Sequence, residues 1–284
     1  QVDGALNSYI TVTADRAMAD AHRAERQISS GNYRGPMHGI PVAVKDQFYT
    51  KGILTTGGSN ILKDFVPGED ATVISKLNEA GAVLLGKLNM SELAMGGTER
   101  PPWGVPGNPW DLERTPGESS SGSGVALAAQ LCAVSMGEDT GGSGRGPAAY
   151  CGVVGLRPTF TRVTRHGMTP MCWFMDTAAP MTKTVEDCAL LLGTVAGHDP
   201  SDPYTSRRPV PDYTASLGQE IRGLRVGLIR ELHETEDVHP EVKGAIESAL
   251  EMFRGLGCQV REVSIPLIAK AGAIFVGIAD TEGA

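Results

Sequence analysis

The sequence predicts an α/β fold, in which helices and strands alternate along the chain and pack in layers. Three neighbouring segments carry this pattern. Residues 39–46 form a β-branched run that is typical of a buried strand, residues 70–81 place apolar side chains at helical spacing, and residues 82–85 return to a short apolar run. Because such alternation is typical of layered α/β proteins, we expect helices to cover a central sheet.

The helix over 70–81 has recognisable ends. Asp70 is the predicted N-cap, and Gly81 follows the last turn at the position where glycine commonly stops a helix. Its buried face is expected to consist of Val73, Ile74, Leu77 and Ala80. An Ala-, Arg- and Glu-rich segment, residues 13–30, predicts a surface helix earlier in the chain.

The remaining elements follow from the same criteria. Thr184 is expected to cap a helix, with Asp187 in the capping-box position, and Pro240 to open another at its first residue. The Pro-, Asp- and Ser-rich residues 198–218 predict a surface connection. We expect helices over 88–99, 125–131, 184–195 and 240–255, and strands over 133–136, 224–229 and 258–265.

Composition and charge exclude several classes of protein. The 284 residues are 41% hydrophobic and 20% charged, which is ordinary for a soluble globular protein. A net charge of −8 argues against a nucleic-acid partner, and no apolar run suggests a membrane span or signal peptide. Five widely spaced cysteines without a C-x-x-C motif predict neither disulfides nor a metal site. We therefore expect a cytoplasmic protein without a metal or cofactor.

Two Gly/Ser-rich turns, residues 117–124 and 139–144, stand out in the middle of the chain. The apolar segment between them must be buried, so both turns are expected to be anchored to the core and not to act as flexible linkers. Closely spaced glycines allow backbone N–H groups to converge on one point. A serine in such a turn can meet a bound carbonyl with amides beside it to hold an oxyanion.

Lys45 is unusual because it ends the apolar strand over 39–46. An isolated buried ammonium is costly, so a lysine at this position is either paired or functional, unless it reaches the surface at the strand end. This segment alone leaves both interpretations open.

Several catalytic arrangements are absent from the sequence. No serine has glycines at both −2 and +2, as a nucleophile elbow requires, and no H-E-x-x-H, P-loop or S-x-x-K motif occurs. None of the six histidines lies in a Gly/Ser turn. Phosphate binding by the Gly-rich turns remains an alternative, although the P-loop lysine is missing. The candidates that remain are the serines of the turns with a distant lysine.

Five segments resemble the amidase signature family of serine hydrolases. They are GIPVAVKD at 39–46, AMGGTE at 94–99, NPWDLERTPGESSSGS at 108–123, EDTGGSGRGPAAYCGVVGLRPT at 138–159 and MDTAAPMTKTVEDCALLLGTVAG at 175–197. The resemblance covers a signature core of about residues 36–200. It implies that residues 1–284 form a single α/β/α catalytic domain with a central mixed sheet flanked by helices. Family domains are longer, so we expect a C-terminal part to be missing from this chain.

The resemblance also implies a Ser–cis-Ser–Lys triad. Ser143 corresponds to the nucleophile, Ser119 to the bridging serine and Lys45 to the base, which we expect to be neutral when it acts. The peptide bond before the bridging serine is cis in the family. The amides of Thr140, Gly141, Gly142 and Ser143 are expected to form the oxyanion hole.

The substrate pocket departs from the family pattern. Glu118 and Ser121 stand where glycine is common, and Gly144 replaces a bulky apolar residue; Gly146 is also unusual. We expect Met95, Gly96, Trp173 and Phe174 to contact substrate, although the two aromatic residues could equally be ordinary core. An apolar site of this kind predicts hydrolysis of apolar or aryl amides, carbamates (urethanes) or esters.

Two other functions remain open. The first is the A subunit of a tRNA-dependent amidotransferase, although such subunits usually carry GGSIRQPA where this chain has GGSGRGPA. The second is a non-catalytic binding protein on the same scaffold, which the intact Lys45, Ser119 and Ser143 argue against. The expected partner is a small-molecule amide, carbamate or ester, with no nucleic acid and no membrane; the assembly, if there is one, is expected to be a homodimer.

Overall fold

A computed structural model describes residues 2–96 and 101–283 of the chain. It divides into two compact units, Gln1–Ala215 with Gly283, and Ser216–Glu282 with Ala284. The first unit contains Lys45, Ser119 and Ser143, the three residues expected to carry out catalysis. The sequence predicted one catalytic domain over the whole chain, and that assignment stays a prediction.

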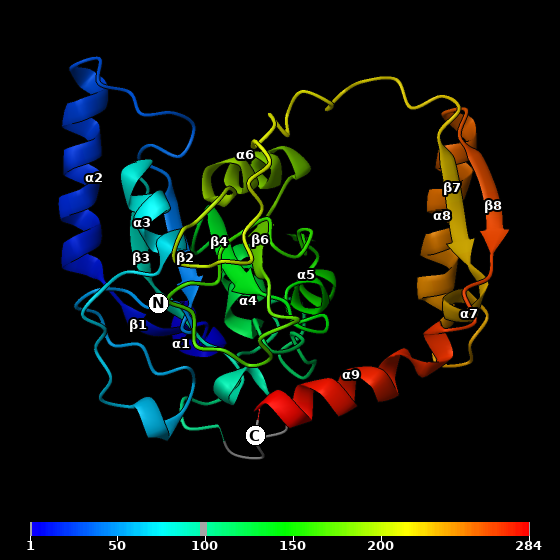
Figure 1. Cartoon of the computed structure of the whole chain (residues 1–284), viewed down its shortest axis with the longest axis horizontal. Helices are drawn as coiled ribbons and strands as arrows, with labels where there is room; N and C mark the ends of the chain where they lie inside the picture. The colour runs from blue at the N-terminus through cyan, green and yellow to red at the C-terminus, as the bar shows by residue number, and fades with distance from the viewer. Residues whose placement is uncertain (1, 97–100, 284) are drawn as a thin grey trace. The chain divides into compact units, whose positions relative to one another are not determined.

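The first unit is built on a six-stranded mixed sheet (Figure 1). The central strands β3, β2 and β4 run parallel, whereas β1 and β6 run antiparallel to their neighbours, and β5 pairs with β6. The predicted α/β fold with a central mixed sheet is confirmed. In spatial order the strands are β1 (Tyr9–Val12), β3 (Val83–Leu88), β2 (Pro41–Lys45), β4 (Val134–Glu138), β6 (Ala178–Thr182) and β5 (Val154–Gly155).

Helices cover both faces of this sheet. Along β2, Val42 and Val44 pack in a core with α3 (Thr72–Glu79) and α6 (Val185–Val195). Ala43, between them, packs in a second core with α4 (Ser121–Ala128) and α5 (Arg145–Cys151). Since successive side chains of a strand point to opposite faces, the short run of β2 holds both helical layers onto the sheet.

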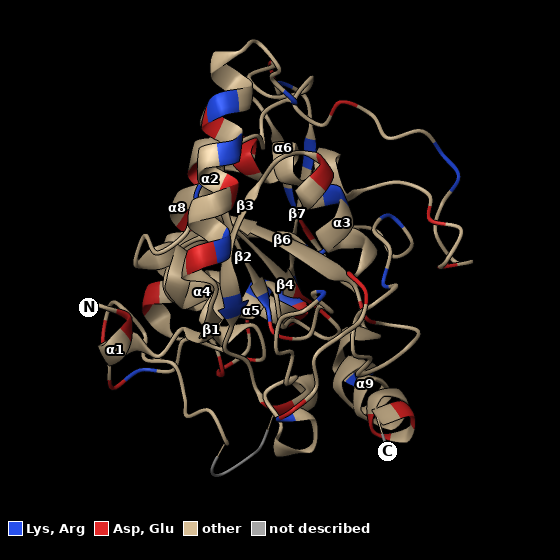
Figure 2. Ribbon diagram, turned by 90° about the vertical axis from the view of Figure 1, so that its left-hand side faces the viewer, with Lys and Arg blue, Asp and Glu red and all other residues tan. Residues whose placement is uncertain are grey.

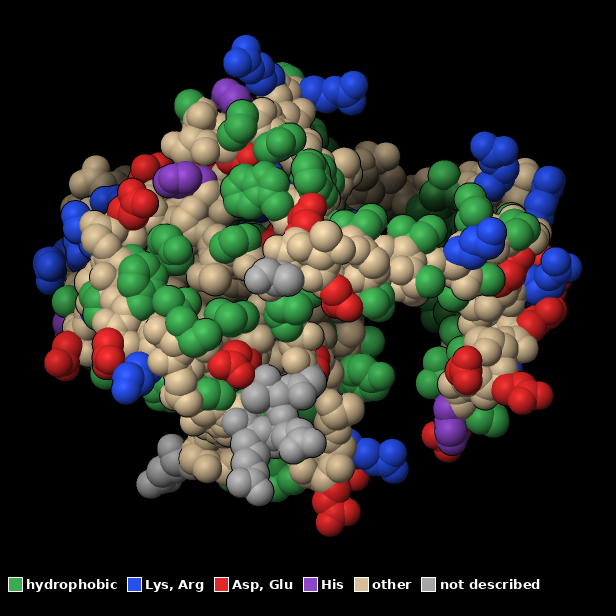
Figure 3. All heavy atoms as spheres, turned by 60° about the horizontal axis from the view of Figure 1, so that its bottom comes forward, with side chains coloured by type: hydrophobic (Ala, Val, Ile, Leu, Met, Phe, Trp, Pro, Cys, Tyr) green, Lys and Arg blue, Asp and Glu red, His purple; other side chains and the backbone are tan. Residues whose placement is uncertain are grey.

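The predicted surface helix is confirmed as α2 (Ala14–Ser29), preceded by the short α1 (Asp3–Leu6). Acidic and basic residues are distributed along the ribbon of α2 (Figure 2), and the Asp20 carboxylate pairs with both Arg16 and Arg23. On the face shown in Figure 3, charged side chains are likewise interspersed with apolar ones.

The helix predicted over 70–81 is confirmed as α3, but its N-cap was assigned wrongly. Ala71 occupies that position, and the Asp70 carboxylate instead accepts hydrogen bonds from the Lys51 amide at 2.7 Å and from Asn78 Nδ2 at 3.2 Å. Gly81 follows the helix with a φ of +81°, as expected for a stop.

The helix predicted over 88–99 is wrong for the residues that the structure describes. Leu88 ends β3, and only a single 3₁₀ turn, Glu92–Ala94, follows it; residues 97–99 lie outside the described part of the chain. The Asn89 side chain accepts a hydrogen bond from the Met90 amide at 2.8 Å, and Leu93 and Ala94 have positive φ. Such local side-chain bonding competes with helix formation.

Helix α5 and strand β6 were not predicted from the sequence, and each contains a proline. Pro147 lies within the first turn of α5, where a missing N–H is tolerated. Pro180 lies in β6 between two partner strands, a position where proline argues against a strand. The strands predicted over 39–46, 82–85 and 133–136 and the helix predicted over 125–131 are confirmed, with shifted ends.

The second unit contains a parallel pair of strands, β7 (Arg225–Ile229) and β8 (Gln259–Val263), connected through α8 (Pro240–Gly255). These elements confirm the predictions over 224–229, 240–255 and 258–265. The unit also holds α7 (Arg230–His233) and most of α9 (Ile268–Gly283). Within the described ranges, no helix is long and apolar enough to cross a membrane.

Gly122 in α4 provides a test of this packing. A Cβ atom at this position would lie 2.4 Å from the Ser8 carbonyl oxygen and 2.6 Å from the amide nitrogen of Asn89. Because backbone atoms cannot give way, we expect Gly122→Ala to lower the free energy of unfolding by about 1–3 kcal/mol or more in a denaturant titration.

Gly193 in α6 is the matched control, since a Cβ there meets nothing within 4 Å. Replacing it with alanine should increase stability by up to about 1 kcal/mol through helix propensity alone. Equal stabilities of the two variants would contradict the packing described for α4.

Candidate active site

The candidate site lies where two parallel strands end. Lys45 is the last residue of β2 and Glu138 the last of β4, and the ladder between them pairs Val44 with Met136. Both charged side chains are fully buried, and Lys45 Nζ lies 3.0 Å from Glu138 Oε2. The carboxyl ends of neighbouring parallel strands are a common position for sites in α/β proteins.

The turn over 117–121 brings Ser119 against Lys45. Lys45 Nζ donates a hydrogen bond of 2.7 Å to Ser119 Oγ, and Ser119 is almost fully buried. The peptide bond between Glu118 and Ser119 is cis, as the family resemblance implied. The Ser120 amide donates to the Ser143 carbonyl at 3.2 Å, which places the two turns side by side. The structure thus brings the three expected triad residues into one region.

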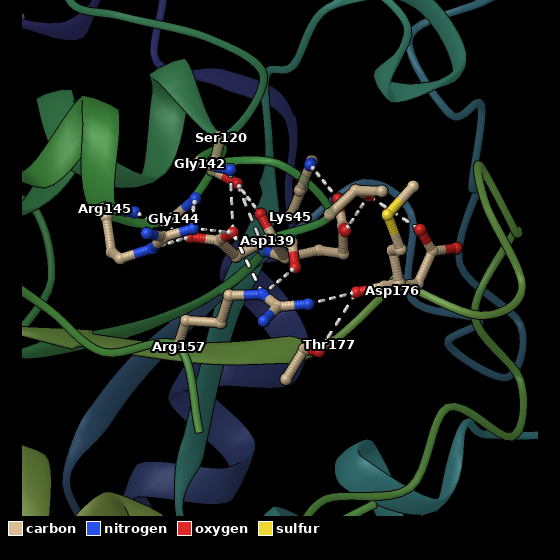
Figure 4. A network of polar contacts seen from close by, with 12 residues as sticks. Lys45, Ser120, Asp139, Gly142, Gly144, Arg145, Arg157, Asp176 and Thr177 are labelled. Carbon is tan, nitrogen blue, oxygen red and sulfur yellow. Dashed lines mark hydrogen bonds and ion pairs between the residues drawn. The ribbon is translucent and has the colours of Figure 1, made fainter. Parts of the chain in front are cut away.

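The buried carboxylate of Asp139 organises the second turn (Figure 4). It accepts hydrogen bonds from the Gly142 amide at 2.8 Å and from Arg145 Nε at 2.8 Å and Nη2 at 2.9 Å, and Arg157 Nε lies 3.4 Å away. Burial acts to raise the pKa of Asp139, but the hydrogen bonds from Arg145 and Gly142 outweigh it and lower the pKa. The carboxylate therefore remains charged and holds the turn.

This arrangement modifies the expected oxyanion hole. The Gly142 amide is already bonded to Asp139, so it is not available to an oxyanion while that bond is made. The amides of Thr140, Gly141 and Ser143 remain the candidates in this turn.

Two buried acids that the sequence analysis did not select lie behind Lys45. The Thr140 hydroxyl lies 2.5 Å from Glu138 Oε1 and 2.7 Å from Asp176 Oδ1. Asp176 also accepts from the amides of Met171 at 2.8 Å and Cys172 at 2.9 Å. Burial and the nearby Glu138 charge raise the pKa of Asp176 to about 6. Both acids lie in segments that resemble the family, Glu138 directly before the DTGGS turn and Asp176 at the start of MDTAAP, but nothing in the sequence links the two.

A second buried lysine, Lys87, has a structural role. Lys87 Nζ lies 3.2 Å from Asp46 Oδ1 and donates to the Phe48 carbonyl at 2.7 Å and to Thr55 Oγ1 at 2.8 Å. Burial lowers the pKa of Lys87, which the Asp46 charge partly offsets. Its contacts anchor the loop after β2 and do not reach Ser119.

A cleft of about 410 Å³ is lined in part by Gly117, Glu118 and Ser121, which belong to the turn that carries Ser119. Its described lining does not include Lys45, Ser119 or Ser143. None of the four residues expected to bind substrate belongs to its described lining. The lining residues are Met90, Ser91, Glu92, Pro101, Gly104, Val105, Pro106, Thr115, Pro116, Gly117, Glu118 and Ser121.

The expected substrate residues lie in two other places. Trp173 and Phe174 are 43% and 59% exposed, so neither is ordinary core. The Arg165 guanidinium lies 4.7 Å from the Trp173 ring centroid, and Phe174 meets Tyr204 edge-on at 6.5 Å. These contacts occupy part of both rings, and their role in substrate binding stays a prediction.

Met95 and Gly96 follow the 3₁₀ turn after β3. Met95 is 43% exposed, and a Cβ atom at Gly96 would lie 2.7 Å from Glu118 Oε2. Gly96 therefore lies against the side chain that borders the cleft. Across the described ranges, no group of three or more His, Cys, Asp or Glu residues could hold a metal ion.

The chain is similar to A subunits of glutamyl-tRNA(Gln) amidotransferases. The A subunit of glutamyl-tRNA(Gln) amidotransferase from Geobacter sulfurreducens is 50% identical over 281 residues, and that from Thermosynechococcus vestitus is 46% identical over 283. Each match covers 99% of this chain and 58% of the relative, so the chain spans little more than half of their length.

The solved structures that resemble this chain include an amidotransferase A subunit and a peptide amidase. The A subunit of glutamyl-tRNA(Gln) amidotransferase from Thermotoga maritima superposes with a TM-score of 0.87 at 36% identity, covering 100% of this chain and 60% of that one. The native peptide amidase of Stenotrophomonas maltophilia superposes with a TM-score of 0.90 at 37% identity, covering 98% and 58%. The family model described as Amidase matches residues 1–284, and the chain therefore belongs to the amidase family.

Proposed function

We propose that this protein cleaves amide-type C–N bonds through a serine acyl-enzyme, with Ser143 as nucleophile, Ser119 as bridge and Lys45 as base. The observation that carries the proposal is the 2.7 Å hydrogen bond from Lys45 to Ser119 in a fully buried setting. A serine hydroxyl is a weak nucleophile and needs a positioned base. Here the lysine is already bonded to the serine that would relay the proton.

The reaction would proceed in two stages. As Ser143 Oγ attacks the carbonyl carbon, its proton passes to Ser119, which gives its own proton towards Lys45. The amides of the Asp139-anchored turn would stabilise the oxyanion. The leaving amine takes a proton back through Ser119, and water then releases the acid from Ser143 by the same route. Asp139 contributes by holding the turn that carries both the nucleophile and the amides.

For the substrate, the relatives favour the amidotransferase alternative over the small apolar amides predicted first. The two relatives of that name described above are 50% and 46% identical over nearly the whole chain. We propose the side-chain amide of glutamine as the first substrate to test. If this proposal holds, a tRNA takes part in the overall reaction, which would be at odds with the expectation of no nucleic-acid partner.

A small-molecule amide or carbamate is the second candidate. The peptide amidase shares this fold at 37% identity, and the cleft lined by Glu118 also has prolines and Val105 in its wall. The exposed Glu118 carboxylate on the same wall would disfavour anionic amides. Urethane hydrolysis, a homodimer and a cytoplasmic location stay predictions.

Covalent labelling tests the nucleophile. A fluorophosphonate should add to Ser143 Oγ, because its phosphorus centre is attacked as the carbonyl carbon would be, and peptide mass spectrometry should find the label there. Ser143→Ala should abolish labelling, whereas Ser201→Ala, at an exposed position in another loop, should retain it. A label on a different residue of active protein would refute the assignment.

Replacement of Lys45 tests the base. Lys45→Met keeps the volume of the side chain but removes the amine bonded to Ser119, so turnover should fall by about 10²–10⁴. Lys76→Met is the control; its amine bonds the carbonyls of Val195 and Ala196, and turnover should stay close to wild type. Turnover of Lys45→Met within a factor of a few of wild type would exclude Lys45 as the base.

A substrate panel separates the two candidates. Release of ammonia from glutamine should exceed hydrolysis of p-nitroanilides and aryl carbamates if the amidotransferase alternative holds. The opposite order would favour the small-molecule alternative, and Ser143→Ala gives the background rate for each substrate.

A further inference from the structure

The hydrogen-bonded chain that begins at Ser119 does not end at Lys45. Lys45 Nζ lies 3.0 Å from Glu138 Oε2, and Glu138 Oε1 lies 2.5 Å from Thr140 Oγ1. Thr140 Oγ1 in turn lies 2.7 Å from Asp176 Oδ1. All of these groups are buried, and Figure 4 shows Lys45 and Asp176 within one network of polar contacts.

The Thr140 hydroxyl determines how many protons this series of hydrogen-bonded side chains must hold. A hydroxyl carries one hydrogen, so Thr140 can donate to Glu138 or to Asp176 but not to both. The second short contact needs a proton on one of the carboxyl groups, since two oxygens without a hydrogen between them repel. The buried acids therefore share one proton in addition to those of Lys45.

Asp176 is the site where this proton is held most easily. Burial and the adjacent Glu138 charge raise the pKa of Asp176 to about 6, despite the amide hydrogen bonds that it accepts. Glu138 Oε2, in contrast, is already engaged with Lys45 Nζ at 3.0 Å. With Asp176 protonated, its O–H donates to Thr140, and Thr140 donates to Glu138.

We propose that Glu138 is the positioning residue and proton acceptor behind Lys45, and that Asp176 controls its basicity through Thr140. This inference rests on the proposed function and adds to it two residues outside the Ser-Ser-Lys set. In place of the neutral lysine expected from the sequence, Lys45 then acts as a relay and Glu138 as the final acceptor. When Ser119 gives a proton to Lys45, Lys45 gives one to Glu138 Oε2, so the lysine keeps three hydrogens. One proton has moved from Ser143 to Glu138 as the bond from Ser143 Oγ to the acyl carbon forms. The leaving amine later takes this proton by the reverse path.

The other charged groups near these hydrogen-bonded side chains are already paired with groups of opposite charge. Glu138 faces Lys45 from β2 and Asp176 from the loop before β6. Its chain neighbour Asp139 is paired with Arg145 and Arg157. On β2 and β3, Asp46 and Lys87 form a separate pair. Ionisation of Asp176 is therefore the charge change expected next to Glu138 near neutral pH.

The pH dependence has a definite sign. As the pH rises through about 6, Asp176 loses its proton and places a second negative charge near Glu138. Glu138 then accepts a proton more readily, and Ser143 becomes more reactive. Below about pH 6 the extra proton is retained, and the reactivity of Ser143 falls.

The rate constant for fluorophosphonate labelling of Ser143, measured on the purified protein across pH 6, tests this inference without requiring a known substrate. In the wild type this rate constant should fall as the pH drops below about 6, which gives the pH profile an acid limb. Glu138→Gln removes the acceptor but keeps the shape, and should lower labelling by at least about 10-fold at every pH. Asp176→Asn cannot take up the negative charge, so it should label at about the low-pH rate of the wild type at every pH, without the acid limb.

Two further variants control for damage to the fold. Asp46→Asn removes the carboxylate of the other buried lysine pair and should leave the acid limb where it is. Glu138→Asp keeps a carboxylate on a shorter side chain, so Ser143 should be labelled faster in this variant than in Glu138→Gln. If Glu138→Gln does not fold, Glu138→Asp takes its place in the test. Slower labelling of Glu138→Asp than of the wild type would then support the inference.

The outcomes separate the two proposals. Wild-type labelling rates in folded Glu138→Gln, or an unchanged acid limb in Asp176→Asn, would overturn the inference while Ser143 remains the nucleophile. No labelling of Ser143 in the wild type would overturn the proposed function, and this inference with it.

Discussion

The buried ammonium group of Lys45 is the constraint on which the candidate site depends. A lysine with no exposed surface at the end of a central strand is tolerated only if hydrogen bonds and an opposite charge replace water. The structure supplies both, through Ser119 at 2.7 Å and Glu138 at 3.0 Å. The same two contacts place a hydroxyl and a carboxylate on either side of the amine, as a proton relay requires.

The fold positions these partners through its topology. Parallel pairing of β2 and β4 brings Lys45 and Glu138 to one edge of the sheet, and α4 starts directly after the turn that carries Ser119. The second turn is held separately by Asp139, which bonds backbone amides on one side and Arg145 on the other. Each chemical group is thus fixed by a different part of the scaffold, and the bond from Ser120 to Ser143 joins the two turns.

Local patterns predicted the α/β class and most helices and strands, because burial repeats at the period of each element. The motifs around Lys45, Ser119 and Ser143 predicted the site, and the buried apolar strand before Lys45 singled this lysine out. Asp176 could not be found in this way, since its link to Glu138 through Thr140 joins a distant loop to a strand end. The helix expected after β3 does not form where the Asn89 side chain accepts a hydrogen bond from the Met90 amide. Trp173 was expected to be pocket or core; it is 43% exposed and its ring contacts Arg165, so it is not core, and a role in the pocket stays a prediction.

Membership of the amidase family and the geometry around Lys45 lead to one central claim: Lys45 acts on Ser143 through Ser119. A crystal structure of the protein after reaction with a fluorophosphonate tests it most directly. The account predicts density continuous from Ser143 Oγ to phosphorus, with Ser119 Oγ within hydrogen-bond distance of both Lys45 Nζ and the modified oxygen. An adduct on another residue, or a Ser119 side chain turned away from Ser143, would contradict it.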